Sequence, residues 1–210
     1  RTHVTPDAQA VMAFPAVEVI VEATGVPPAG IRHALAAIDH GKHIVMVNVE
    51  ADALAGPLLA RKAKAAGVVY SLAWGDQPAL ICEHVDWARA CGFTVIAAGK
   101  GTRYEPHYHQ STPANVWDIL DKYLNISDRN SINPKIFNSF VDGTKSGIEM
   151  TAVCNATGLL PQSDGLSFPP ATRDELVGSD HDRLATANMS CKIFNLISYE
   201  CTNANYHSEK

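Results

Sequence analysis

Four polar side chains, Asn138, Asp142, Lys145 and Glu149, recur at spacings of four, three and four residues. In a helix these spacings place all four on one narrow stripe. We predict such a helix over 134–157, opened by a proline and followed by a glycine. Most of its remaining circumference is apolar or small, which is typical of a buried helix. The polar stripe then lines either a ligand cavity or a solvent-filled slot with weak ion pairs.

The cavity interpretation has a specific chemistry. A carbonyl group that accepts a hydride needs the charge on its oxygen neutralised, and a lysine ammonium can supply that proton. Lys145 is our candidate donor, Asp142 its partner, and Glu149 a third catalytic candidate. A divalent cation held by the two carboxylates is left open, since the lysine between them competes for the same charge. The paired histidines His107 and His109 lack an obvious third ligand, so we expect no metal there.

The first hundred residues indicate the scaffold. Short runs rich in Val or Ile are typical of strands covered on both faces; they cover 17–23, 44–48, 68–73 and 93–98. Between them lie segments that begin near a proline and end at a glycine, as helices do; they cover 28–40, 53–66 and 78–91, and Pro57 marks the expected start of the middle one. Strand and helix alternating in this way predict right-handed crossovers and one parallel sheet.

In a parallel sheet all strand ends lie on one edge, where ligands bind. The residues at these ends are Thr24-Gly25, then Asn48, then Gly75-Asp76-Gln77, then Gly99-Lys100-Gly101-Thr102. Taken singly, the glycines and small polar residues are ordinary turn formers. Because all of them lie on one edge, a ligand pocket is as well supported as the interpretation that they only form turns.

No Gly-x-Gly-x-x-Gly turn occurs anywhere in the sequence. The run that starts at Gly99 lacks the third glycine and follows the last strand instead of the first. We therefore expect that the glycine-rich half of a nucleotide-binding sheet is missing and that the chain is N-terminally truncated.

A family resemblance appears in several strings that occur in order. They are Glu22-Ala23-Thr24-Gly25, Trp74-Gly75-Asp76-Gln77-Pro78, Gly99-Lys100-Gly101-Thr102, Asp142-Gly143-Thr144-Lys145 and Asn155-Ala156-Thr157-Gly158. The first resembles the later part of a homoserine-dehydrogenase-type NAD(P) domain. The whole series, over about residues 1–177, resembles bacterial 1-deoxy-D-xylulose 5-phosphate reductoisomerase-like proteins, relatives of homoserine dehydrogenase that often carry a SAF domain. One departure is Asn48-Val49, where homoserine dehydrogenases usually have Asn-Lys, which counts against homoserine as substrate.

The resemblance implies NADP or NAD as cofactor, held by Ala23, Thr24, Gly25 and Asn48. It favours the cavity interpretation of the helical stripe, with Lys145, Asp142 and Glu149 as catalytic residues. Four residues are expected to bind a small, phosphorylated carbonyl substrate: Lys100, Arg103, Asn138 and Gln77. Two alternatives stay open, an inactive fragment without the glycine-rich turn and a homoserine-dehydrogenase-type activity, so whether this chain alone is an enzyme is left undecided.

The fold class expected is α/β: the C-terminal half of a Rossmann-like parallel sheet, then the start of a mostly helical or α+β catalytic region. The expected domains are a partial NAD(P)-binding domain over 1–104, a partial catalytic domain over 105–177 and an unrelated, disordered tail over 178–210. Within that tail, 193–199 could form a short strand or helix.

Composition limits the partners. The formal charge of -5 argues against nucleic-acid binding, and the longest apolar run, 16–23, is too short to span a membrane. Five scattered cysteines without a close pair favour a reducing cytoplasm over a disulfide framework. The expected partner is a small-molecule substrate, with a homo-oligomer possible for the full-length protein.

Overall fold

The computed structural model describes residues 2–102, 105–122, 128–161, 165–166, 168 and 195–201, with only the backbone for Ile96 and for the last segment. The chain divides into two compact units, one of residues 1–83 and 151–159, the other of residues 84–150 and 160–210. The described elements form a mixed α/β structure, which confirms the expected fold class.

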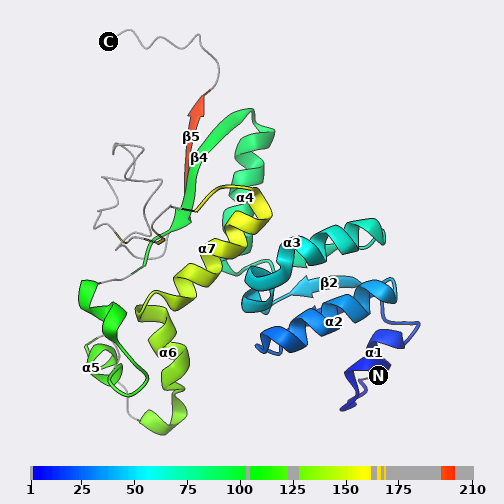
Figure 1. Cartoon of the computed structure of the whole chain (residues 1–210), viewed down its shortest axis with the longest axis horizontal. Coiled ribbons are helices and arrows are strands. Elements are labelled where there is room, and N and C mark those ends of the chain that lie inside the picture. Colours follow the sequence, from blue (N-terminus) through cyan, green and yellow to red (C-terminus); the bar gives the residue numbers. More distant parts are fainter. Residues whose placement is uncertain are drawn as a thin grey trace. The chain divides into compact units, whose positions relative to one another are not determined.

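The first unit is built on a three-stranded parallel sheet with the order β1-β2-β3. Its strands are β1 (Val19–Glu22), β2 (His43–Met46) and β3 (Tyr70–Leu72). Helices α2 (Pro27–Asp39) and α3 (Val49–Ala65) connect the strands and pack on the sheet, as Figure 1 shows for β2, and the short α1 (Ala8–Ala13) precedes them. The strand–helix alternation predicted from the sequence is confirmed here.

The core of this unit lies on one face of the sheet. Ile20, Ile44 and Met46 are buried there among side chains of the helices. The alternate residues of β1, Val19 and Val21, are 50% and 62% exposed. The prediction that the strands are covered on both faces is therefore wrong for β1, which alternates buried and exposed positions as a strand with one covered face does.

The predicted helix ends are confirmed at three glycines. Gly41, Gly67 and Gly92 follow α2, α3 and α4 (Gln77–Ala90) with φ of 68°, 72° and 84°. These angles lie in the left-handed region that only glycine enters without strain.

The predicted start of α3 at Pro57 is wrong. The helix begins at Val49, where the Asn48 side chain accepts a hydrogen bond from the backbone N–H of Ala51, and Pro57 lies inside it. A proline in a helix leaves the carbonyl four residues earlier without its usual donor. Here that carbonyl belongs to Ala53, and the Asn155 amide donates to it at 3.1 Å. A side chain distant in sequence thus replaces the lost helical bond.

The fourth predicted strand does not join the parallel sheet. β4 (Phe93–Lys100) pairs antiparallel with β5 (Asn195–Cys201) in a separate two-stranded sheet of the second unit. The prediction that Lys100 ends on the same sheet edge as Thr24 and Asn48 is therefore wrong. β5 shows that the strand alternative at 193–199 was the right one for 195–199.

The predicted helix over 134–157 is two helices, α6 (Pro134–Val141) and α7 (Thr144–Thr157). The break lies at Asp142-Gly143, where Gly143 has a φ of 92°. The second unit also contains the short helices η1 (Pro106–Gln110), α5 (Trp117–Leu120) and η2 (Arg129–Ser131). None of the helices that the structure describes is long and apolar enough to cross a membrane.

Candidate functional site

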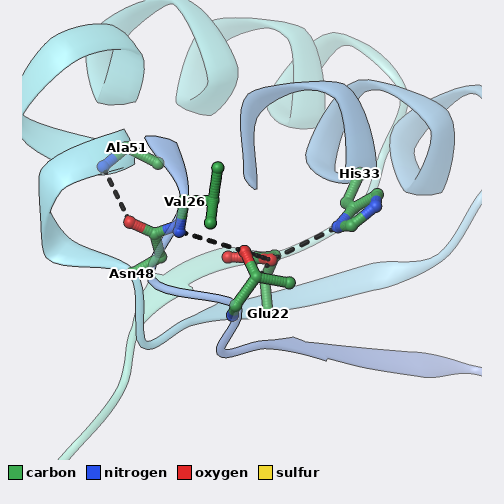
Figure 2. A network of polar contacts seen from close by, with 6 residues as sticks. Glu22, Val26, His33, Asn48 and Ala51 are labelled. Carbon is green, nitrogen blue, oxygen red and sulfur yellow. Dashed lines mark hydrogen bonds and ion pairs between the residues drawn. The ribbon is translucent and has the colours of Figure 1, made fainter. Parts of the chain in front are cut away.

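A buried carboxylate organises the end of β1. Glu22 is 2% exposed. Its Oε1 accepts hydrogen bonds from the Thr24 hydroxyl at 2.7 Å and the Thr24 backbone N–H at 3.3 Å. His33 on α2 places its Nδ1 3.3 Å from the same oxygen (Figure 2). Glu22 therefore fixes the Thr24-Gly25 turn, for which the family resemblance implies a place in the cofactor site.

Asn48 connects this network to the next strand. Its Oδ1 caps α3 at the Ala51 N–H, 3.2 Å away, and its side chain lies near the Glu22 carboxylate and lowers the pKa of that carboxyl (Figure 2). A Cβ on Gly30 would lie 2.8 Å from Asn48 Nδ2 and 2.9 Å from Glu22 Oε2. Only glycine at position 30 leaves room for the two polar groups, so the network joins the ends of β1 and β2.

Opposing effects set the charge of Glu22. Burial alone would raise the pKa of its carboxyl, but hydrogen bonds from Thr24, His33 and Asn48 outweigh burial and lower the pKa below its usual value. Glu22 is therefore ionised at neutral pH, and its partners are held as donors.

The end of β3 completes this edge of the sheet. Gly75 has a φ of 104°, and Asp76 Oδ1 accepts a hydrogen bond from the Gln77 N–H, where α4 begins. A shallow, largely apolar pocket lies here, lined by Met46, Val49, Leu72, Ala73, Asp76, Pro78 and Ala79. The predicted substrate residue Gln77 thus lies beside a pocket at the carboxyl ends of β2 and β3. Trp74 also lies at this edge; sequence reasoning missed it.

In the second unit a buried carboxylate holds two lysines. Glu149 on α7 is 1% exposed. Its Oε1 lies 2.5 Å from the Lys145 ammonium, and its Oε2 contacts the Lys100 ammonium at the end of β4. The Lys145 side chain is 35% exposed and that of Lys100 only 8%. Lys100 was assigned to the substrate, and the structure brings it together with two catalytic candidates.

Asp142 lies at the junction of α6 and α7. Its Oδ2 accepts from the Asn138 amide and its Oδ1 from the Thr144 backbone N–H, both at 2.8 Å. Its carbonyl accepts a hydrogen bond from His109 Nδ1 at 2.7 Å. The carboxylate therefore caps α7 at Thr144, the residue before Lys145, and the Lys145 ammonium forms its ion pair with Glu149.

Arg103 lies outside the described residues. The described His, Cys, Asp and Glu side chains form no group of three that could hold a metal ion. His107 instead lies 3.4 Å from Glu105, and His109 contacts the α6–α7 junction.

Two family models match consecutive parts of the chain. The homoserine dehydrogenase NAD-binding domain matches residues 1–72, and the catalytic domain of oxidoreductase DRL matches residues 75–190. The second match covers more than half of the chain. The chain belongs to the DRL oxidoreductase family. No curated protein matches it.

Both matches fall on the sites described above. The Glu22 network lies within the NAD-binding match, and the Glu149 cluster lies within the DRL catalytic match. The resemblance to homoserine-dehydrogenase-like and reductoisomerase-like oxidoreductases is confirmed at the family level. As a DRL family member the chain combines an NAD(P)-binding part with an oxidoreductase catalytic part.

Proposed function

We propose that this DRL family chain is part of an NAD(P)-dependent enzyme that reduces a small, phosphorylated carbonyl compound in a reductoisomerase-like reaction. The first unit binds the cofactor, and the second supplies the proton and the anion-binding charge. The two family matches and the chemistry of the two sites support this proposal.

The contact of Glu149 with two lysines is the observation that carries the proposal. A carboxylate this buried is stable as an anion only beside compensating cations. Two ammonium groups around one carboxylate leave one net positive charge. Such a cluster attracts an anionic substrate and stabilises negative charge that develops on a carbonyl oxygen.

We assign Lys145 and Lys100 different roles in the reaction. Lys145 is the more exposed lysine, so we assign it the transfer of a proton from Nζ to the substrate oxygen. Glu149 holds that ammonium in place, and after the transfer the neutral Lys145 amine takes up a proton from solvent, to which its side chain is 35% exposed. Lys100 compensates the buried carboxylate and, with Arg103, Asn138 and Gln77, is assigned to the substrate.

Asp142 acts at the start of α7. Because its carboxylate caps the first turn, it sets the direction in which the next residues of the helix project. We assign it the positioning of Lys145.

The strand ends of the first unit fit a nicotinamide cofactor. A Cβ at Gly25 would meet no atom within 4 Å, and φ there is 65°, so a flat ring can approach the backbone. Ala23, Thr24, Gly25 and Asn48 are the residues assigned to hold it. When bound, the cofactor supplies the hydride; Glu22 keeps the Thr24 turn and the Asn48 side chain in fixed positions.

The test compares two lysine substitutions in the second unit. K145M removes the proposed donor, while K135M changes an exposed lysine on α6. NADPH oxidation is measured with phosphorylated aldehydes and ketones and with their unphosphorylated counterparts. We expect K145M to lower kcat/KM by about 10²- to 10⁴-fold, the usual contribution of a general acid. Its NADPH affinity and the activity of K135M should stay at wild-type values.

Wild-type activity in K145M would remove the catalytic assignment, and equal rates for phosphorylated and unphosphorylated substrates would remove the phosphate preference. The second candidate function is an inactive binding remnant, favoured by the lack of a Gly-x-Gly-x-x-Gly turn in the sequence. A 210-residue chain that shows no fluorescence change with millimolar NADPH would decide for the remnant.

A further inference from the structure

Trp74 is an exposed aromatic side chain held in one orientation. Its residue surface is 75% exposed. Its indole N–H donates to Glu83 Oε2 on α4 at 2.8 Å. A hydrogen bond through the edge of the ring fixes its direction and leaves ring faces open to a ligand. An isolated exposed tryptophan needs no explanation, but the location of this one gives it a role.

That location is the ligand-binding edge of the parallel sheet. β2 and β3 pair with Met46 opposite Leu72, and the Ala73 N–H donates to the Met46 carbonyl at 3.0 Å. Trp74 and Asn48 each follow these paired residues by two positions, so they lie at neighbouring strand ends. Two residues that line the apolar pocket, Ala73 and Asp76, lie one residue before and two residues after Trp74 in the sequence.

Apolar side chains are exposed at each of the three strand ends. Val26 follows β1 and is 52% exposed, and Val47 follows β2 and is 44% exposed. Together with Trp74 these valines add exposed apolar surface to an edge whose other side chains are polar and hydrogen-bonded. A flat heteroaromatic ring with one polar substituent suits such a surface.

We propose that Trp74 is the stacking residue for the nicotinamide ring of the cofactor. This inference rests on the proposed cofactor binding and adds a residue that neither the resemblance nor the family matches assign. The oxidised ring is a cation, and tryptophan is the side chain that best attracts a cation over its face. Trp74 therefore binds the oxidised cofactor more strongly than the reduced one, which favours hydride transfer from NAD(P)H to the substrate more than an apolar residue would.

Stacking has a spectroscopic signature that a structural role lacks. Indole is electron-rich and the oxidised nicotinamide ring electron-poor, so face contact quenches indole emission and produces a charge-transfer absorption. The chain contains three tryptophans, which makes single substitutions informative. Trp87 on α4, 55% exposed, is the matched control.

The experiment titrates wild type, W74F and W87F with NADP⁺, NAD⁺ and ADP-ribose, and follows binding in parallel by calorimetry. We expect both oxidised cofactors to quench wild type and W87F with a charge-transfer band, and W74F to lose both signals. W74F keeps a ring and should bind within about twofold of wild type. W74A should raise the Kd for NADP⁺ by about three- to tenfold and the Kd for NADPH by less.

Each other outcome overturns the proposal. Quenching that survives in W74F, or wild-type affinity in W74A, would show that Trp74 does not contact the ring. Quenching by ADP-ribose, which lacks nicotinamide, would mean that adenine occupies the position. Calorimetric binding without a Trp74 signal removes this inference alone, whereas no binding to any variant removes the proposed cofactor site as well.

Discussion

The hydrogen bond from Asn155 to α3 should contribute to the stability of the fold. Pro57 has no N–H, so the Ala53 carbonyl lacks its helical donor. Asn155 Nδ2 donates to that carbonyl at 3.1 Å and lies 3.4 Å from the Asp52 carbonyl. We expect N155A to lower the free energy of unfolding by about 1–2 kcal/mol, because it leaves a partly buried carbonyl without a protein donor.

The substitution P57A tests whether N155A lowers the free energy of unfolding because the Ala53 carbonyl loses its donor. Alanine at position 57 restores the backbone N–H that bonds Ala53, so Asn155 is no longer needed. In the P57A background N155A should cost less than about 0.5 kcal/mol, which gives a coupling of about 1 kcal/mol between two positions far apart in sequence. P57A alone should stabilise the chain, since proline is unfavourable inside a helix.

The assay is urea unfolding at pH 7 followed by far-UV circular dichroism of wild type, both single variants and the double variant. A control for the loss of an exposed asparagine is N130A in η2. If N155A costs the same with proline and with alanine at position 57, the Asn155 side chain does not replace the missing helical bond and the reasoning is wrong.

Two further predictions concern the sites themselves. Because hydrogen bonds lower the pKa of Glu22 below its usual 4.5, the ionised carboxylate stabilises the folded chain above that pH and the contribution is lost as pH falls through the folded-state pKa. E22Q should therefore be less stable than wild type by about 2 kcal/mol at pH 7, and the two denaturation curves should converge below pH 4.5; a difference independent of pH would contradict this. G143A should cost about 1–3 kcal/mol, because φ is 92° and an added Cβ would lie 2.9 Å from His109 Cε1. Its control, G147A in α7, meets no atom within 4 Å and should stabilise the helix by up to about 1 kcal/mol, so equal effects of the two substitutions in thermal unfolding would refute the argument.

The sequence could predict the strands and helices of the first unit because their signals are local. β-branched runs, prolines near helix starts and glycines after helix ends act within a few residues. The same signals failed at Pro57, since an asparagine about a hundred residues later supplies the donor that lets α3 continue. They also failed at β4, because a short apolar run does not reveal whether its partner is parallel or antiparallel.

The polar stripe was predicted only in part. Lys145 and Glu149 lie four residues apart on one continuous helix, and their contact was available from spacing alone. Asn138 and Asp142 also touch, but the left-handed Gly143 ends their helix before Lys145, so a single straight stripe does not exist. A glycine inside a helical pattern is tolerated often enough that the pattern did not reveal this break.

The contact between Lys100 and Glu149 could not be predicted from spacing, because 49 residues separate the two side chains. It nevertheless determines the net charge of the cluster. With Lys145 alone, the ion pair would be neutral and would carry no net charge to attract an anion. The second ammonium makes the cluster cationic while it compensates the buried carboxylate, which supports the proposed proton transfer from Lys145 to a substrate. The residue type at position 100 therefore controls the charge of the site: K100M should convert an anion-binding cluster into a neutral pair, whereas K100R should preserve it.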